Sequence, residues 1–139
     1  MFPKKVYYGL RFVLALSLLK ENSHLGVAEL AEKEELPVKF LEAIAVALRK
    51  NGIINVKRGA GGGYFLARSL GEIKLYDIVL ILDEKMEKEI STSGVNSEKA
   101  VGLFMNTVKA DYIKLLKNYS LEDLMSHYSD DNERIMYYI

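Results

Sequence analysis

Hydrophobic residues recur at helical spacing in three successive segments of the first fifty residues. The first segment runs from Val6 to Leu19, with Arg11 as its only charge, and a break at Asn22 and Ser23 separates it from a second of about two turns. The third runs from about Pro37 to Asn51, and the glycine that follows suits a helix C-terminus. Because about four residues join the second and third segments, the pattern predicts a helix-turn-helix.

A strand-like pattern comes directly after the third segment. Short β-type runs at 53–56 and 64–66 flank a tip at 59–63 that contains four glycines. A recognition helix fits the major groove of DNA, and a thin hairpin beside it can reach the minor groove. The predicted fold is therefore mainly α with a small β-hairpin wing, a winged helix-turn-helix.

The second half of the chain predicts further helices and a polar loop. Helical periodicity resumes from Glu72 to Leu82, and Ser97 can begin a long helix. A last helix begins at Ser120, followed by an apolar tail at 136–139 that we expect to dock. The predicted organisation is a DNA-binding domain at 1–84, a loop at 85–96, and a dimerisation helix with a tail at 97–139.

One stripe of the long helix carries apolar side chains at spacings of three and four. It fits either an ordinary core helix or a helix that packs against its twin in a homodimer. Because the first 82 residues already supply a core, we favour a dimer interface. The residues of this stripe are Val101, Phe104, Met105, Val108, Tyr112 and Leu115.

Charge is distributed unevenly along the chain, although the net charge is zero. Residues 1–70 hold 11 Lys and Arg against 6 Asp and Glu, a balance of +5, whereas residues 71–139 hold 8 against 13, a balance of -5. This asymmetry indicates that the first half faces a polyanion.

No apolar run is long enough for a membrane span, so we expect a soluble cytoplasmic protein.

The wing and the third helix carry the candidate contacts to double-stranded DNA. Lys57 and Arg58 begin the tip, where a guanidinium can enter a narrow minor groove, and the glycines leave backbone N–H groups free for phosphate oxygens. In the first two turns of the helix, Lys39 can reach phosphate or guanine and Glu42 can accept from cytosine. Phe40 fits either the groove or the core. A glycine-rich tip alone also fits a plain mobile loop.

Enzymatic chemistry finds little support in the sequence. The glycine-rich tip misses the last glycine of a dinucleotide-binding loop and precedes a strand rather than a helix. His24 and His127 have no partners at metal-ligand or triad spacing, and the acidic residues near 84–89 alternate with lysines as on a solvated surface. We therefore predict no catalytic residue, metal or cofactor.

Several motifs resemble those of the Rrf2 family of bacterial winged-helix transcription regulators. They are Tyr8–Arg11, Val27–Ala31, Phe40–Glu42, Leu48–Gly52, Arg58–Arg68 and Glu72–Val79, and the resemblance is close over about the first 84 residues. It implies that Glu42 reads bases, that Arg58 enters the minor groove, and that Tyr8 and Arg11 lie near the DNA backbone. The candidate DNA-binding residues are Tyr8, Arg11, Val38, Lys39, Phe40, Glu42, Lys57, Arg58, Gly59, Gly61, Gly62, Gly63 and Tyr64.

The sequence departs from the family pattern in two respects. Phe40 stands where many members have tyrosine, so a hydroxyl contact to the DNA backbone is lost. Members that hold an iron-sulfur cluster place three cysteines before the long helix, and this chain has none anywhere. The resemblance therefore implies a cluster-free homodimeric regulator, expected to repress at a palindromic operator and to respond to a small molecule or a partner protein. The alternative is a protein-interaction module that regulates a partner enzyme.

Overall fold

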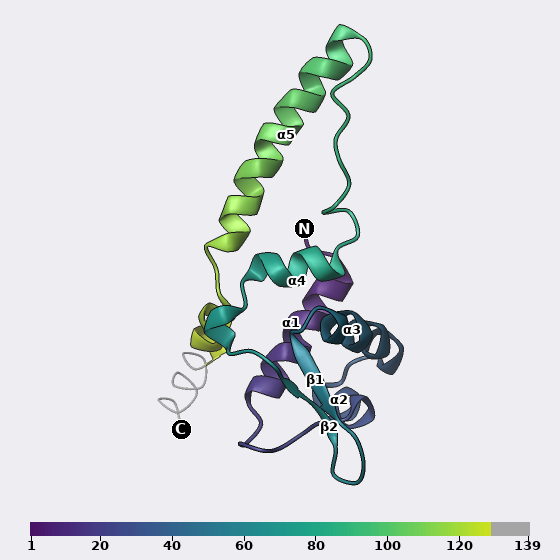
Figure 1. The fold of residues 1–139 in the computed structure, drawn as a ribbon, viewed down its shortest axis with the longest axis vertical. Helices are drawn as coiled ribbons and strands as arrows, with labels where there is room; N and C mark the ends of the chain where they lie inside the picture. Colours follow the sequence, from purple (N-terminus) through teal and green to yellow (C-terminus); the bar gives the residue numbers. More distant parts are fainter. Residues whose placement is uncertain (129–139) are drawn as a thin grey trace.

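The computed structural model describes residues 1–128, and the apolar tail at 136–139 lies outside this range. The winged helix with a long C-terminal helix, predicted from the sequence, is confirmed (Figure 1). Its elements are α1 (Lys4–Ser17), α2 (Val27–Glu34), α3 (Val38–Lys50), β1 (Ile54–Lys57), β2 (Gly63–Leu66), a 3-10 turn (Leu70–Glu72), α4 (Leu75–Leu82) and α5 (Asn96–Lys117), and a further helix begins at Leu121.

The core forms around α1, which packs against α2, α3, α4 and β2. Its inward residues Val6, Phe12 and Val13 are fully buried, and so are Leu41 and Ile44 on the facing side of α3. These positions are the ones that the three- and four-residue spacing assigns to one helical face. Apolar burial on this scale makes the first three helices a rigid support for the surface residues of α3.

The turn between α2 and α3 contains a residue in the left-handed conformation. Glu35 ends α2 with φ 53° and ψ 49°, and the Leu36 N–H donates to the Ala31 carbonyl at 2.9 Å. Arg11 of α1 donates from its guanidinium to the Glu34 carbonyl oxygen at 2.6 Å, with the Glu34 carboxylate 3.8 Å away. The angle between α2 and α3 is thus held by a tight turn and by a cation placed at the end of α2.

We predict that Glu35→Gly stabilises the protein. Glu35 is exposed, and its left-handed backbone conformation costs an L-residue about 1–2 kcal/mol. Glycine relieves this strain, but it also increases the conformational entropy of the unfolded chain, which offsets part of the gain in stability. The free energy of unfolding should rise by about 0.5–1 kcal/mol in a chemical denaturation experiment. Glu32→Gly, at an exposed helical position, is the matched control and should lower it by a similar amount.

The end of α3 is fixed by a two-bond motif around a glycine. Gly52 has φ 73°, its N–H donates to the Arg49 carbonyl at 3.1 Å, and the Ile53 N–H donates to the Leu48 carbonyl at 3.0 Å. Ile53 and the following Ile54 are buried in the core. The sequence prediction for Gly52 is confirmed, and β1 leaves α3 in one defined direction.

The hairpin lies against a third extended segment. Strands β1 and β2 are antiparallel, with Ile54 opposite Leu66 and Lys57 opposite Gly63. Leu25, just before α2, exchanges both backbone hydrogen bonds with Tyr64, at 2.8 and 3.0 Å. The free edge of β2 is therefore partly paired, and the wing base is joined to the segment that leads into the helix-turn-helix.

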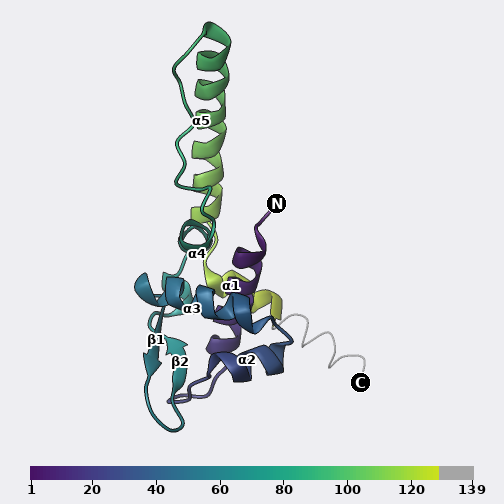
Figure 2. The same ribbon diagram turned by 90° about the vertical axis from the view of Figure 1, so that its right-hand side faces the viewer.

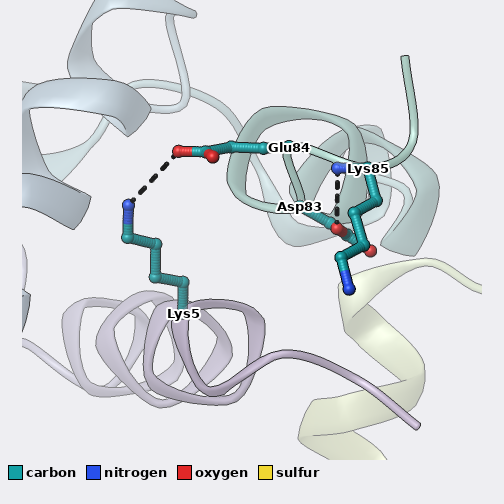
Figure 3. Close-up of polar contacts among 4 residues, drawn as sticks. All are labelled: Lys5, Asp83, Glu84 and Lys85. Carbon is teal, nitrogen blue, oxygen red and sulfur yellow. Dashed lines mark hydrogen bonds and ion pairs between the residues drawn. The ribbon is translucent and has the colours of Figure 1, made fainter. Parts of the chain in front are cut away.

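A strap segment, residues 83–95, runs from α4 to the far end of α5 and lies alongside that helix (Figures 1 and 2). Its start is close to α1, where Lys5 Nζ lies 3.9 Å from Glu84 Oε1, and the Asp83 carboxylate accepts from the Lys85 N–H at 3.0 Å (Figure 3). Further along, Lys109 of α5 donates to the Lys88 carbonyl at 2.8 Å.

Gly102 allows the strap segment to approach α5 closely. A β-carbon at this position would collide with the Ser91 carbonyl oxygen, and one turn further Asn106 Nδ2 lies 3.4 Å from the Ile90 carbonyl oxygen. One face of α5 is therefore covered by the protein's own backbone.

The chain returns from α5 to the first domain. Leu116 and Leu121 are buried in the same core as α1 and α3. The Leu121 N–H donates to the Ile73 carbonyl at 2.9 Å, and the Asp123 carboxylate caps the last helix by accepting from the Ser120 N–H at 2.9 Å. The base of α5 is thus fixed rigidly to the winged helix, while its far end projects (Figure 2).

Candidate nucleic-acid interface

The outward face of α3 presents the side chains that the sequence singled out. Val38, Lys39 and Glu42 are exposed, because the opposite face of the helix is used for the core. Phe40 is 38% exposed, and its ring packs against Tyr8 of α1 with 5.5 Å between centroids. Phe40 therefore lies on the surface beside the core rather than within it.

Aromatic contacts continue from Phe40 across the surface of α1. The Tyr8 ring also contacts Tyr7, with 5.5 Å between centroids, and the Arg11 guanidinium lies 5.8 Å from the centre of the Tyr7 ring. Tyr8 and Arg11 are half-buried, and the Arg11 guanidinium already donates a hydrogen bond to the Glu34 carbonyl oxygen. These contacts position the α1 surface next to the start of α3.

The wing tip is exposed and shaped by glycines. Lys57 and Arg58 are both exposed, and neither takes part in an ion pair within residues 1–128. Gly59 and Gly61 have φ of 102° and 73°, and the Gly62 N–H donates to the Gly59 carbonyl at 3.0 Å. The tip is a tight turn that holds two cations at the edge of the molecule.

Gly63 and Tyr64 are the first two residues of β2, and Gly63 lies opposite Lys57 in the hairpin. Gly63 has φ 143°, and a β-carbon there would lie 2.6 Å from the backbone carbon of Leu25. The Tyr64 ring is half-buried and packs edge-on against the core residue Phe12, with 6.0 Å between centroids. Both residues dock the wing on the domain, a role that the sequence interpretation did not assign to them.

We predict that Gly63→Ala disrupts wing docking. The substitution combines a disfavoured φ with a collision against backbone that cannot move freely, so the free energy of unfolding should fall by about 2–4 kcal/mol. Gly61→Ala, which also has positive φ but meets no atom within 4 Å, is the control and should lower it by only about 1 kcal/mol. Thermal or chemical denaturation measures both, and equal losses would contradict the docking role of Gly63.

Sequence reasoning missed the later part of the outward face of α3. Val46, Arg49 and Lys50 lie beyond the first two turns of the helix, and all three are exposed. The signal was present in the sequence, because positions spaced by three and four from Lys39 share its face.

The apolar stripe of α5 is largely exposed in the single chain. Phe104 is 66% exposed and Val108 47% exposed. Met105, Val108 and Tyr112 also border a hollow of about 500 Å³ whose other side includes Met86 and Ile90 of the strap segment. Burial raises the pKa of the Tyr112 hydroxyl above its ordinary value, and the negative charge of Asp83 adds to this shift. Both effects favour the neutral hydroxyl of Tyr112 over the phenolate.

Residues 1–128 match neither the pattern of a metal-ligand cluster nor that of a membrane-spanning helix. Among residues 1–128, no group of three or more His, Cys, Asp or Glu side chains could hold a metal ion. In the same part of the chain, no helix combines the length and apolar character that crossing a bilayer requires.

The sequence profile of the Rrf2 family, described as iron-dependent transcriptional regulators, matches residues 2–127. The chain belongs to the Rrf2 family. A protein of Synechocystis sp. named as an HTH-type transcriptional regulator is 35% identical over 83 residues, which are 60% of this chain and 56% of that protein. The chain spans about half the length of the curated relatives it matches, which include proteins named IscR.

Solved structures of Rrf2-type regulators share the fold. The structure of T. potens IscR superposes with a TM-score of 0.72 and 26% identity, covering 92% of this chain and 88% of that one. Staphylococcus aureus CymR gives a TM-score of 0.67 and 27% identity, covering 88% and 95%. These relatives are named as transcriptional regulators, not as enzymes.

The residues present do not fit a thiolate-held iron-sulfur cluster. Such clusters are held by cysteine thiolates, and the full sequence contains no cysteine. In the strap segment, which precedes the long helix, the exposed residues 91–93 are Ser, Thr and Ser. Hydroxyl groups are poor ligands for such a cluster at neutral pH, so the iron dependence in the family description does not extend to this chain by that route.

Proposed function

We propose that this chain is a sequence-specific regulator that binds double-stranded DNA through α3 and the wing. The observation that carries the proposal is the pairing of an exposed recognition surface on α3 with two exposed cations at the wing tip, separated by only residues 51–53 and β1. Lys39 and Glu42 supply base or phosphate contacts, and Arg58 enters the adjacent minor groove. A DNA target places the protein in the bacterial cytoplasm.

We infer that the protein acts as a homodimer through the exposed stripe of α5. A stripe that covers about 100° of a helix surface is wide enough for a two-helix seam, and a contiguous apolar face of this kind is rarely left in water. The strap segment covers the Gly102 face of α5 and shares a hollow with Met105, Val108 and Tyr112. The stripe residues Val101, Phe104 and Leu115 stay exposed and can contact a second copy. A two-fold dimer reads two half-sites, so the operator is a palindrome.

Occupation of such an operator next to a promoter blocks transcription, which makes repression the proposed mode. Because the chain has no cysteine to hold an iron-sulfur cluster, the signal proposed to control its DNA binding is a small molecule or a partner protein.

Selection of bound sequences from a random DNA pool tests the proposal. The unmodified protein should enrich one palindromic motif, and its affinity for that motif should fall steeply as salt rises, because Lys and Arg release counterions from phosphate. The same selection in the presence of candidate effectors would reveal which one changes the enrichment. Failure to enrich any motif at low salt would contradict the proposal.

A further inference from the structure

The outward face of α3 has an apolar centre between charged ends. Lys39, Glu42, Ala43, Val46 and Lys50 lie at spacings of three and four and therefore share one side of the helix. All five are exposed, and Val46 is 53% exposed. The four positions from Lys39 to Val46 have the i, i+3, i+4, i+7 spacing with which a homeodomain recognition helix reads the major groove.

Val46 leaves more than half of its surface in water in the described domain. Its neighbours Ile44, Ala45 and Leu48 are fully buried on the other side of the helix. A β-branched residue is a weaker helix former than alanine, and an apolar side chain here remains in water. An exposed valine in the middle of a charged recognition surface is best explained by an apolar group that covers it.

The major groove of DNA offers one such group, the C5-methyl of thymine. Small aliphatic side chains on a recognition helix contact it directly, whereas cytosine presents an amino group and no methyl at the corresponding edge. We propose that Ala43 and Val46 read thymine methyl groups within each half-site. This inference rests on the proposed function and adds a base preference to it.

The helix geometry limits how many bases this centre can read. Residues 43 and 46 are separated by about 4.5 Å along the helix axis, compared with about 3.4 Å between successive base pairs. One or two neighbouring thymines per half-site therefore fall under the two side chains. Lys39 and Lys50 flank them toward the phosphates, and Glu42 is placed for a cytosine beside them.

Deoxyuridine substitution in the selected operator tests the inference, because it removes only the methyl group and keeps base pairing. Each thymine is replaced in turn, and binding is measured by fluorescence anisotropy. At one or two positions per half-site, the loss of methyl burial should weaken binding about fourfold, and about fifteenfold when both half-sites are changed. If deoxyuridine has no effect at any position of a specifically bound operator, the inference is wrong and the proposed function stands.

The variant Val46→Ala identifies the side chain responsible. Alanine favours the helix, so this variant should fold as well as the unmodified protein. It should bind the thymine operator several-fold more weakly, and its deoxyuridine penalty should shrink below about twofold at the thymine that Val46 contacts. Val95→Ala, another exposed valine, is the control and should keep the full penalty. An unchanged penalty in Val46→Ala would overturn the inference. If the unmodified protein shows no sequence-specific DNA binding at all, the proposed function itself is wrong.

Discussion

Replacing Arg58 by alanine should weaken binding to the selected operator by roughly 10- to 100-fold. Arg58 is exposed at the wing tip, and the tight glycine turn that follows it fixes the direction of the backbone. A guanidinium in a narrow minor groove gains from the concentrated negative potential there, and alanine removes both the charge and the hydrogen-bond donors. Titrations at several salt concentrations should show a salt dependence reduced by about one released ion per half-site.

Lys114→Ala provides the control for the loss of one positive charge. Lys114 is exposed on α5, outside the proposed DNA-binding surface. This variant should bind the operator within about twofold of the unmodified protein, with little change in salt dependence. If the two variants lose affinity equally, the wing contributes only long-range charge, and the minor-groove role of Arg58 is wrong.

Val108→Glu should convert the proposed dimer to monomers. Val108 lies in the exposed stripe of α5, and a two-fold interface places each substitution in both copies. Burying an unpaired carboxylate in place of a methyl-bearing side chain costs about 2 kcal/mol per copy, so the dimer should weaken about a thousandfold. Sedimentation at micromolar concentration measures the change in mass. Operator affinity should fall with it, because a single half-site loses the benefit of linked binding.

Ala110→Glu is the matched control for the added charge. Ala110 is exposed, and two steps of about 100° from Val108 place it on the opposite side of α5. It should leave the dimer intact. A monomeric unmodified protein, or equal dissociation of both variants, would show that the stripe is not the interface.

Most of the winged-helix fold could be predicted from sequence because its signals are local. Helical periodicity identified α1, α2 and α3, and the glycine at position 52 marked the end of α3 through its backbone freedom. The hairpin followed from two short β-type runs around a glycine-rich tip. The exposure of Val38, Lys39 and Glu42 follows from the same periodicity.

Other features depend on contacts between distant segments and left no local signal. Tyr64 points toward Phe12, and Gly63 is constrained by Leu25, although neither partner is near in sequence. Leu121 joins the core only because the chain returns from α5, so a boundary near residue 97 does not separate two cores. The left-handed Glu35 was equally hidden, since glycine or asparagine usually marks such a position.

The fixed joint between α3 and β1 has a mechanical consequence for DNA recognition. The two hydrogen bonds around Gly52 and the burial of Ile53 leave the recognition helix and the wing without a hinge between them. In the proposed complex with DNA, α3 and the wing would therefore span a fixed distance between a major groove and the neighbouring minor groove. Operators would then be sorted by helical twist and groove width as well as by their bases.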